Sequence, residues 1–378
     1  MPLSGTYPAP DSPFATGDGG AVDVYLRPVA FVTQVEDDPG AWPLTGGPRG
    51  FSAVEVLRRA GEGVEREVVP VALLDDWLQE KPGNERVALL EKFAALETGR
   101  ESFAGLDLDR PRLMGIVNVT PDSFSDGGLA FEPASAIAHG RTLLAAGADI
   151  LDVGGESTRP GAAPVDEAEE VRRVLPVVQA LAEDGAVVSV DTRRAAVARA
   201  ACAAGAHIVN DVTALGGDPE AIAAVAEAGA SVVLMHMQGE PRTMQHDPQY
   251  RFAPCDVFDF LAGRIEACEE AGIPRHRIAV DPGIGFGKTP AHNLQLLSHL
   301  SMLHGLGCPV LLGASRKSFI SLVAGKAGPG ERLAGTLAAN QAALEQGVQI
   351  LRVHDVAEAR QAVSIWSAIA RSSLPHDC

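Results

Sequence analysis

Several polar side chains of this chain directly follow short runs of apolar residues, and three of them are hydrogen-bond acceptors. Asp191, Asn210 and Asp281 each follow a run rich in Val and Ile. Such carboxylate and amide oxygens suit a neutral heterocycle with several N–H groups, for example an amino-pyrimidinone. Binding would be selective, because an analogue without those donors leaves buried acceptors unpaired at about 1–3 kcal/mol each. A salt-bridge cluster with Arg193 or Lys317 is the structural alternative.

Positive charges follow the last two apolar runs. Arg316 and Lys317 come after one of them, and Arg352 and His354 lie at the end of the other. Residues two apart in a strand point to the same face, so Arg352 and His354 can contact one phosphate group. In a chain with a net charge of −18, such a local gathering of cations indicates an anionic ligand. A solvated surface pair is the alternative.

Two apolar side chains near these polar groups suit an aromatic ligand. The segment DPGIGFGK, residues 281–288, joins three glycines to Phe286, whose ring can form an apolar wall. Met235 comes one residue before His236 and can offer a polarisable face to a flat ring. Each signal is weak by itself, because glycine-rich loops are common and a methionine in an apolar run usually belongs to the core.

Two further loops are polar and rich in small residues. The stretch LMGIVNVTPDSFSDGG, residues 113–128, begins as a buried strand and changes to Asp, Ser and Gly soon after Asn118. ESTRPGA, residues 156–162, is similar and can fold over a bound ligand. Its candidate contacts are Thr158, Arg159 and Pro160. The sequence has no ligand spacing for a dedicated metal cage, but a Mg²⁺ held mainly by substrate phosphates, with Asn118 as a single protein oxygen, is compatible with it.

The elements that position these residues repeat along the chain from Pro111 onward. Each unit has an apolar strand, a polar loop and an Ala-rich helix that usually ends at Gly. The expected strands are LMGIVNV, ADILDVGG, AVVSVD, HIVNDV, SVVLMHM, RIAVDPG, PVLLGAS and VQILRVHD. Strands of this kind that alternate with helices indicate a parallel sheet covered on both faces. Eight units over roughly 265 residues match an α/β fold of the (β/α)8 TIM barrel type. An open doubly wound sheet is the alternative, and the missing G-x-G-x-x-G after the first strand disfavours it.

Polar residues end all eight expected strands. In order they are Asn118, Asp152 with Glu156, Asp191, Asn210, His236, Asp281, Ser315 with Lys317, and Arg352 with His354. In a barrel these ends converge on one rim, where barrel enzymes build their active sites. A single residue of this kind can instead be a satisfied core polar group or a helix cap, and we expect that of Asp152. Eight such endings together favour a common site.

Residues 1–108 do not follow this pattern. They are expected to form a small α+β accessory region beside a barrel domain of residues 109–378. Residues 1–20 are rich in Pro, Gly and Ser, which is typical of disorder. The region has no chemical motif, so its function stays open, and packing against the barrel is the expectation.

Three segments of this N-terminal region have recognisable patterns. Residues 21–35 are expected to form a pair of strands interrupted by Pro28. Residues 51–63 and 84–99 have apolar residues at helical spacing followed by Gly, which predicts two helices.

The composition of the 378-residue chain is typical of a globular enzyme, with 46 % hydrophobic and 21 % charged residues. The net charge of −18 argues against nucleic acid or an anionic membrane as partner, since both attract basic patches. There is no run of about 18 apolar residues and no secretory signal pattern. The cysteines have an odd count and wide spacing, which disfavours a disulfide framework. They are Cys202, Cys255, Cys268, Cys308 and Cys378. These features predict a cytoplasmic protein.

Several of these motifs together resemble those of a known enzyme family. They are MGIVNVTPDSFSDGG, DVGGESTRPGA, VSVDT, IVNDVTAL, LMHMQG, DPGIGFGK, GASRKSFI, GTLAAN and LRVHDV. In this order they are similar to the motif series of the dihydropteroate synthases, over about residues 110–372. The resemblance implies a pterin-binding barrel that joins p-aminobenzoate to 6-hydroxymethyl-7,8-dihydropterin diphosphate in folate biosynthesis. Loss of diphosphate, SN1-like and aided by Mg²⁺, would leave a cationic methylene that the arylamine attacks.

The resemblance also implies a role for each matching residue. It places the pterin against Asp191, Asn210, Met235, Asp281 and Lys317. It assigns the diphosphate to Asn118, Arg352 and His354, with Mg²⁺ on Asn118. The p-aminobenzoate pocket, which is also the sulfonamide target, would consist of Thr158, Arg159, Pro160, Phe286, Lys317 and Ser318. A mobile loop that closes over the site would contain Asp122, Phe124 and Asp126. The groups expected to act in the reaction are Asn118, Asp191, Asp281, Lys317, Arg352 and His354.

Two rival functions and one property of the assembly accompany this interpretation. A pterin-dependent methyltransferase that serves a corrinoid partner shares the pterin-reading Asp and Asn, but it has no need for SRKSF or GFGK, and both are intact. A catalytically idle paralogue would be expected to have lost Lys317, Arg352 or a loop motif. A homodimer is implied by resemblance alone.

Overall fold

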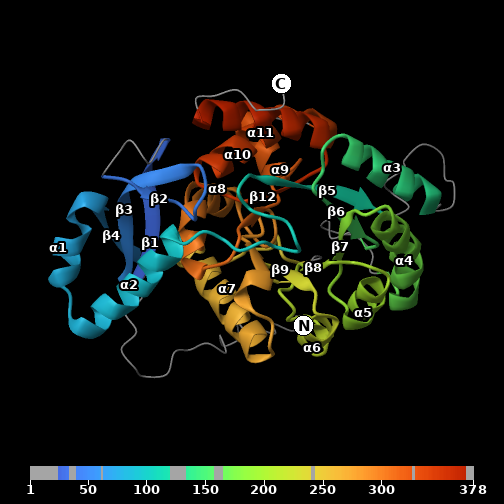
Figure 1. The fold of residues 1–378 in the computed structure, drawn as a ribbon, viewed down its shortest axis with the longest axis horizontal. Helices are drawn as coiled ribbons and strands as arrows, with labels where there is room; N and C mark the ends of the chain where they lie inside the picture. The colour runs from blue at the N-terminus through green and yellow to red at the C-terminus, as the bar shows by residue number, and fades with distance from the viewer. Residues whose placement is uncertain are drawn as a thin grey trace, which may run out of the picture.

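The computed structural model describes residues 24–33, 40–60, 63–119, 133–156, 165–239, 243–325 and 328–371. A barrel with surrounding helices makes up the larger part, and a small N-terminal region packs beside it (Figure 1). Several expectations lie outside the described residues. They are the disorder of residues 1–20, the mobile loop with Asp122, Phe124 and Asp126, and the contacts of Thr158, Arg159 and Pro160.

The described residues of the larger part form an eight-stranded parallel sheet, which confirms the predicted TIM barrel. The strands are β5 (Arg112–Asn118), β6 (Ile150–Gly154), β7 (Val187–Asp191), β8 (Ile208–Asp211), β9 (Ser231–Met235), β10 (Ile278–Asp281), β11 (Leu311–Leu312) and β12 (Ile350–Val353). Their order is β10-β9-β8-β7-β6-β5-β12-β11. A parallel bridge between Val280 and Val310 joins the two ends of this order. All eight strands lie where the sequence predicts them.

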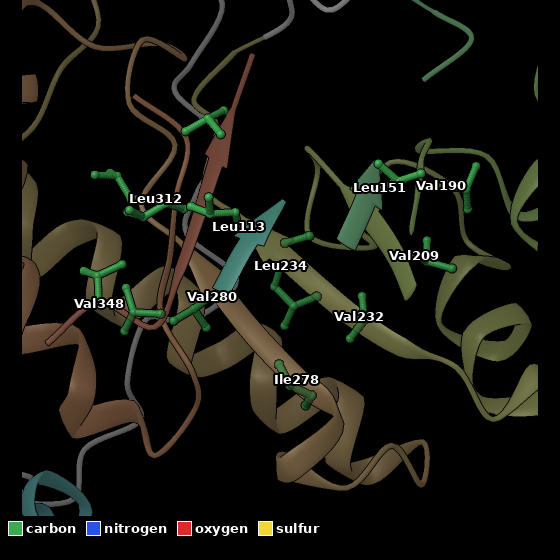
Figure 2. Packing of buried hydrophobic residues seen from close by; sticks show 14 of the residues in the cluster. Leu113, Leu151, Val190, Val209, Val232, Leu234, Ile278, Val280, Leu312 and Val348 are labelled. Atoms are coloured by element: carbon green, nitrogen blue, oxygen red, sulfur yellow. The ribbon is translucent and has the colours of Figure 1, made fainter. Parts of the chain in front are cut away.

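Helices cover the outside of the barrel (Figure 1). They are α3 (Pro133–Ala145), α4 (Glu167–Glu183), α5 (Ala195–Ala203), α6 (Ala221–Ala228), α7 (Ala253–Glu270), α8 (Pro290–Ser298), α9 (Ser318–Ala324), α10 (Leu333–Glu345) and α11 (Val356–Arg371), with 3-10 turns η4 (Arg275–Arg277), η5 (Leu300–Leu306) and η6 (Pro329–Glu331). The outward side chains of the strands pack against them in one large apolar cluster, which includes Leu113, Leu151, Val190 and Val232 (Figure 2). None of the helices in the described ranges has the length and apolar character needed to cross a membrane.

The inward side chains explain why polar residues meet at one end of the barrel. A separate apolar cluster inside the barrel contains Ile150, Ile208, Ala279 and Ile350. Because side chains alternate along a strand, the residue two positions later also faces inward. Those later residues, nearer the carboxyl end of each strand, are Asp152, Asn210, Asp281 and Arg352. The barrel therefore has an apolar layer below and a charged layer above it.

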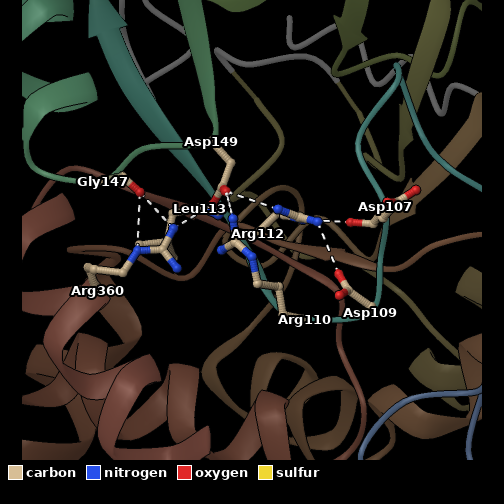
Figure 3. Close-up of polar contacts among 8 residues, drawn as sticks. All are labelled: Asp107, Asp109, Arg110, Arg112, Leu113, Gly147, Asp149 and Arg360. Atoms are coloured by element: carbon tan, nitrogen blue, oxygen red, sulfur yellow. Dashed lines mark hydrogen bonds and ion pairs between the residues drawn. The ribbon is translucent and has the colours of Figure 1, made fainter. Parts of the chain in front are cut away.

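An ion-pair network lies at the amino-terminal end of β5, around Asp149 (Figure 3). Asp149 Oδ2 accepts a hydrogen bond of 2.8 Å from the Leu113 amide, and its Oδ1 accepts one of 2.8 Å from Arg110. Arg112 and Arg360 also pair with this carboxylate. Burial by itself would raise the pKa of Asp149, but the Leu113 amide, Arg360 and Arg110 outweigh it, and the pKa lies below its usual value. The charged group fixes the start of the first barrel strand against α11.

The N-terminal region is a small α+β unit, as the sequence predicts. Its antiparallel sheet contains β1 (Val24–Thr33), β2 (Trp42–Pro43), β3 (Arg49–Ala60) and β4 (Gly63–Pro70), with β1 and β2 on either side of β3 and β4 also paired to β3. The turn η2 (Val71–Leu73) and the helices α1 (Leu74–Gln79) and α2 (Gly83–Glu97) follow. α2 confirms the helix expected over residues 84–99.

Two of the expected elements of this region are wrong. The strand pair over residues 21–35 is one strand, β1, which continues through Pro28 opposite Val54 of β3. Proline is tolerated there because β1 is an edge strand, where a missing N–H breaks no ladder on the open side. The helix expected over residues 51–63 is strand β3. Its apolar residues fit either period, and pairing with strands on both sides decides in favour of the sheet.

Candidate functional site

The carboxyl ends of the barrel strands bring acidic, amide and cationic side chains into one opening. Arg352 of β12 is central, because its Nε donates to Asp152 Oδ2 at 2.6 Å and its Nη2 donates to Asp191 Oδ2 at 2.8 Å. Asn210 Nδ2 also donates to Asp152 Oδ2, at 3.1 Å. Residues from β6, β7, β8 and β12 thus form one connected network. The alternative cluster with Arg193 is absent from the described contacts, since Arg193 pairs instead with Glu156 at 3.5 Å.

Asp281 completes the acidic side of this opening from β10. Its Oδ1 accepts a hydrogen bond of 2.7 Å from the Gly283 amide. Gly313 shows how close Asp281 and Arg352 lie, because a Cβ on that glycine would be 3.5 Å from Asp281 Oδ2 and 4.0 Å from Arg352 Cδ. Met235 is buried and pairs in register with Asp281 on the neighbouring strand. The pterin-reading residues predicted from the sequence are therefore neighbours.

Asp152 is fully buried, and among the described residues its Oδ2 has hydrogen-bond partners while its Oδ1 has none, so the expectation of a satisfied core group holds for one oxygen only. Its Oδ2 accepts from both Arg352 and Asn210. Because the amide nitrogen of Asn210 is turned toward Asp152, its amide oxygen is turned the other way, and this orientation is assigned from the hydrogen-bond network. Asp152 therefore sets how two of the candidate binding residues are presented.

The charges in the opening strongly affect one another. Burial raises the pKa of Asp191 to about 7, the negative charge of Asp152 adds to this, and Arg352 opposes it. Burial also raises the pKa of Asp281, against the Gly283 amide and Lys317. Burial would lower the pKa of Arg352, but Asp152 and Asp191 outweigh it and the pKa lies above its usual value. The Arg352 guanidinium is thus a fixed positive charge, and it lies near two carboxyl groups, Asp191 and Asp281, whose pKa values are raised.

Lys317 extends the cationic side from the turn after β11. Its Nζ lies 3.9 Å from the centroid of the Phe286 ring. Enclosure of the ammonium group lowers its pKa to about 8, with Arg352 acting in the same direction and Asp281 against it. The turn is tight, because Arg316 has a φ of 57° and its amide donates to Thr336 Oγ1 of α10 at 3.0 Å. The hydrogen bond to Thr336 fixes the turn, and the Phe286 ring contacts the ammonium group, so both orient Lys317.

The other predicted cations divide into two groups. His354 lies next to the opening, and its Nδ1 is 2.9 Å from Ser315 Oγ. Arg316, in contrast, pairs with Asp355 through its Nε at 3.0 Å and its Nη2. Asn118 ends β5, and Ser318 is exposed at the first position of α9. Of the side chains expected to attract an anion, Lys317 and Arg352 interact with the acids of the opening, and His354 follows Arg352 by two residues and contacts Ser315.

Residues 281–288 form a loop with unusual backbone requirements. Gly283 has a φ of +69°, and a Cβ there would lie 1.9 Å from the His236 carbonyl oxygen. Gly287 has a φ of +61°, and a Cβ there would lie 2.2 Å from the backbone carbonyl oxygen of Gln238. Both glycines are required because the loop presses against the chain that follows β9. The loop brings Phe286 beside Lys317.

His236 is the rim residue that the sequence placed incorrectly. Its ring packs edge to face on Phe260 of α7, with ring centroids 4.8 Å apart, so it points between β9 and α7. Its Nδ1 lies 2.9 Å from the Nζ of Lys288. The reason is strand alternation, since Met235 takes the inward position and the next residue faces outward.

Lys288 is a buried residue whose role the sequence reasoning missed. Its Nζ contacts His236 Nδ1 and donates to two carbonyl oxygens, that of His236 at 3.2 Å and that of Phe286 at 3.0 Å. Burial lowers its pKa to about 7, while Asp281 raises it. A lysine directly after the glycine-rich run was the available signal. Lys288 therefore holds the loop against the chain after β9.

The donor set tests whether Mg²⁺ fits this site. In the described ranges no three Asp, Glu, His or Cys side chains come together as metal ligands. Asn118 is half-buried at the end of β5 and offers an amide oxygen, a ligand type that Mg²⁺ accepts. These residues fit a Mg²⁺ that takes most of its ligands from substrate phosphates and water, and they do not fit a protein-made cage.

Comparisons with known proteins agree on one family. The sequence profile of the family described as pterin binding enzyme matches residues 114–354. A dihydropteroate synthase of Escherichia coli K12 is 48% identical over 264 residues, which are 70% of this chain and 93% of that protein. One of Neisseria meningitidis serogroup B is 45% identical over 269 residues, with 70% and 94% covered. The N-terminal region lies outside the profile match.

Solved structures give the same result. A Yersinia pestis dihydropteroate synthase in a sulfonamide drug complex has a TM-score of 0.67 and 49% identity, and the match covers 71% of this chain and 97% of that one. A Xanthomonas albilineans dihydropteroate synthase with 4-aminobenzoic acid has a TM-score of 0.67 and 50% identity, with 72% and 97% covered. The same enzyme in complex with 7,8-dihydropteroate has a TM-score of 0.64 and 48% identity, with 71% and 97% covered.

Proposed function

The chain belongs to the dihydropteroate synthase family of pterin-binding enzymes, and on that basis we propose how its barrel performs the reaction. The reaction joins p-aminobenzoate to 6-hydroxymethyl-7,8-dihydropterin diphosphate and yields 7,8-dihydropteroate and diphosphate. One observation carries the assignment of roles. Asp191, Asn210 and Asp281 share one opening with Arg352 and Lys317, so a ring with N–H donors and its attached anion can be held together.

The pterin binds through its ring N–H groups to the acceptor side of the opening. Asn210 turns its oxygen away from Asp152, so this oxygen is available to a donor on the ring. Asp281 uses Oδ1 for the Gly283 amide, and its Oδ2 is left for the ligand. Met235 supports the ring, and Lys317 donates to an acceptor at its edge. The pattern favours a ring that carries donors on one side and a carbonyl on another.

The diphosphate binds to Arg352 and His354. Two of the guanidinium donors of Arg352 serve Asp152 and Asp191, and its remaining N–H groups are available to phosphate oxygens. Because the two carboxylates hold the guanidinium in place, little reorganisation is required when the anion binds. His354 adds a second donor from the same face of β12.

The bond between the pterin methylene carbon and the diphosphate oxygen breaks first. The electron pair leaves with the diphosphate, whose growing negative charge Arg352 and His354 stabilise. The methylene becomes cationic, and Asp191 and Asp281 stabilise it. The amine of p-aminobenzoate then forms the new C–N bond, and its proton passes to the released diphosphate. Exclusion of water matters here, because water would otherwise attack the same carbon.

Mg²⁺ is the metal proposed for this site, held by the Asn118 oxygen and the substrate phosphates. When bound, it would neutralise negative charge on the diphosphate. The p-aminobenzoate side is proposed to consist of Phe286, Lys317 and Ser318 together with Thr158, Arg159 and Pro160. Phe286 offers an apolar face to the benzene ring, and Lys317 beside it offers a cation to the carboxylate.

Product formation tests this function most directly. The two substrates and Mg²⁺ are incubated with the wild-type chain and with Lys317→Ala, and dihydropteroate is measured. We expect activity in the wild type and a loss of kcat/KM of about a hundredfold in the variant, because one preorganised charge is removed. Activity in neither protein would favour the idle paralogue. Methyl transfer to a corrinoid protein without dihydropteroate formation would favour the methyltransferase.

A homodimer is proposed as the assembled form. The helices α8, α9 and α11 all pack against α10 and expose large apolar side chains on this side of the barrel. These are Leu294, Leu322, Val323, Ile365 and Ile369. A second copy of the chain is the occupant that would bury them. Light scattering on the purified protein should give twice the mass of the chain, and a monomer at working concentration would contradict the proposal.

The cytoplasm is proposed as the place where the protein works. Cys202, Cys255, Cys268 and Cys308 are free thiols, and the last three are buried. Free thiols persist in reducing compartments. Recovery of the protein from the periplasmic or extracellular fraction of its cells would contradict this proposal.

A further inference from the structure

The N-terminal region contacts the start of helix α7 through a charged cluster. Arg59 of β3 donates from Nη1 to Asp256 Oδ1 at 2.8 Å, and its Nη2 pairs with Asp259. The hydroxyl of Tyr25 donates to Asp259 Oδ2 at 2.8 Å and accepts from Arg59 Nε at 2.8 Å. Arg59 and Asp256 are partly buried, which makes their contact more than a solvated ion pair, whereas Asp259 is exposed.

Asp256 passes this contact to the backbone that leads into α7. Its other oxygen, Oδ2, accepts hydrogen bonds from the amides of Arg251 at 2.8 Å and Phe252 at 3.2 Å. From β4 of the N-terminal region, the guanidinium of Arg66 lies over the Phe252 ring, 5.1 Å from its centroid. The N-terminal region thus holds residues 251 and 252, directly after Tyr250, from two strands.

Tyr250 connects this held segment to the glycine-rich loop. Its hydroxyl donates to the carbonyl oxygen of Gly287 at 2.8 Å, and its ring lies 4.8 Å from that of His292 at the start of α8. Gly287 lies between Phe286 and Lys288, and Lys288 binds the Phe286 carbonyl. The loop contains three glycines with positive φ, so its own backbone restrains it little. Its position depends on such external contacts.

We propose that the N-terminal region is a positioning element for the p-aminobenzoate side of the site. Arg59 fixes Asp256, Asp256 fixes the backbone before α7, and Tyr250 fixes the loop that carries Phe286. The inference rests on the proposed function, since it takes Phe286 as the wall for p-aminobenzoate. Asp191, Asn210, Arg352 and His354 lie outside this loop, on or directly after β7, β8 and β12. Binding of the pterin diphosphate should therefore depend less on this chain of contacts than binding of p-aminobenzoate does.

Steady-state kinetics of Arg59→Met and Tyr250→Phe test the proposal, with Arg58→Met as the matched control. Arg58 is the neighbour of Arg59 on β3, and it pairs with Glu85 inside the N-terminal region at 2.9 Å. Arg59→Met and Tyr250→Phe should each raise the KM for p-aminobenzoate about fivefold, the effect of one lost hydrogen bond. The KM for the pterin diphosphate should stay within about twofold. Arg58→Met should change neither.

The double variant Arg59→Met with Tyr250→Phe shows whether the two residues act through each other. A shared chain of contacts predicts a combined effect smaller than the product of the two single effects. Independent effects that multiply in full would contradict the proposed chain. This comparison is needed because a line of contacts by itself does not demonstrate coupling.

The remaining outcomes separate this inference from the proposed function. A wild-type chain without dihydropteroate formation would contradict the proposed function itself. An active wild type with an Arg59→Met variant that matches Arg58→Met would overturn only the inference. A lower melting temperature with an unchanged KM for p-aminobenzoate would also overturn it, since that is the result of a purely structural role. If Arg59→Met does not fold, Arg66→Gln removes the contact with Phe252 and must give the same rise in KM.

Discussion

At the scale of single residues, the site depends on acids whose protonation is adjusted by their neighbours. Asp191 lies between the positive charge of Arg352 and the negative charge of Asp152. Burial raises its pKa to about 7, and the guanidinium of Arg352 opposes this rise. The site therefore combines a fixed cation with a carboxyl group whose pKa is set by burial and by its charged neighbours.

Asp152→Asn tests this electrostatic arrangement. Removal of a negative charge favours the ionised form of Asp191, so the pKa of Asp191 should fall. If ionised Asp191 is required, kcat/KM for the pterin diphosphate rises with pH through about 7 in the wild type. In the variant, kcat/KM should rise at a lower pH than in the wild type. Its maximum value at high pH should also be about tenfold lower, because Arg352 and Asn210 lose their shared acceptor. A pH–rate profile measures both effects, and an unchanged limb would contradict the electrostatic account.

Sequence reasoning found the residues that meet in the opening and missed those that support them. Asp191, Asn210, Asp281 and Arg352 were recognisable because each lies at the carboxyl end of a run rich in apolar residues. Lys288 could not be assigned in this way, since its partners are a ring nitrogen and two carbonyl oxygens, and carbonyl positions depend on the folded path of the loop. His236 was expected at the opening, but it comes one residue after the inward-facing Met235 and therefore faces outward.

At the scale of elements, the barrel strands were predictable and the N-terminal strands were not. Each barrel strand is buried on both faces, so an uninterrupted apolar run of strand length leaves few alternatives. The sequence of β3 mixes Val54, Glu55 and Leu57 with three arginines, and it fits a helix or a strand. Its strand conformation depends on β1 and β4, which lie on either side. The spacing of apolar residues within one segment does not show which strands will pair with it.

Asp149→Asn tests how β5 is fixed to the rest of the barrel. The pKa of Asp149 is depressed in the folded state, so its contribution to stability is present above the ordinary pKa of about 4 and is lost as the pH falls through the lower folded value. At pH 7 the variant should lose about 2–3 kcal/mol of unfolding free energy, because several donors lose a charged acceptor. Denaturant unfolding at pH 7 and at about pH 3 measures this, and the difference between the proteins should shrink at the lower pH.

An outcome in which the difference between wild type and Asp149→Asn stays constant from neutral to acid pH would show that the carboxylate charge contributes nothing. The loss would then come from the shape of the substituted side chain. Arg141→Gln is a suitable control, since Arg141 pairs with Asp184 on the exposed surface at 2.8 Å and should change stability little at any pH.

At the scale of the whole molecule, the N-terminal region packs directly against α7 and η5 of the barrel domain. Tyr25 and Leu57 of the N-terminal sheet form a buried apolar cluster with Cys255 of α7 and Met302 of η5. The hydroxyl of Ser301 also donates to the Pro28 carbonyl at 2.9 Å. These contacts join residues more than 190 positions apart, and periodicity along the sequence contains no information about such pairs. They explain why the sequence could predict a second region but not its place.

Removal of residues 1–108 should therefore destabilise the barrel that remains. Cys255 and Met302 are fully buried in the complete chain, and deletion would expose them together with the face of η5. Each large apolar side chain returned to water costs about 1.5–3 kcal/mol, so the truncated chain should melt at lower temperature and self-associate. Calorimetry and light scattering measure the two effects. Leu57→Ala in the complete chain should weaken the same contact by about 2–5 kcal/mol without any deletion. A truncated barrel that is monomeric and melts at the temperature of the complete chain would show that the two regions are energetically independent.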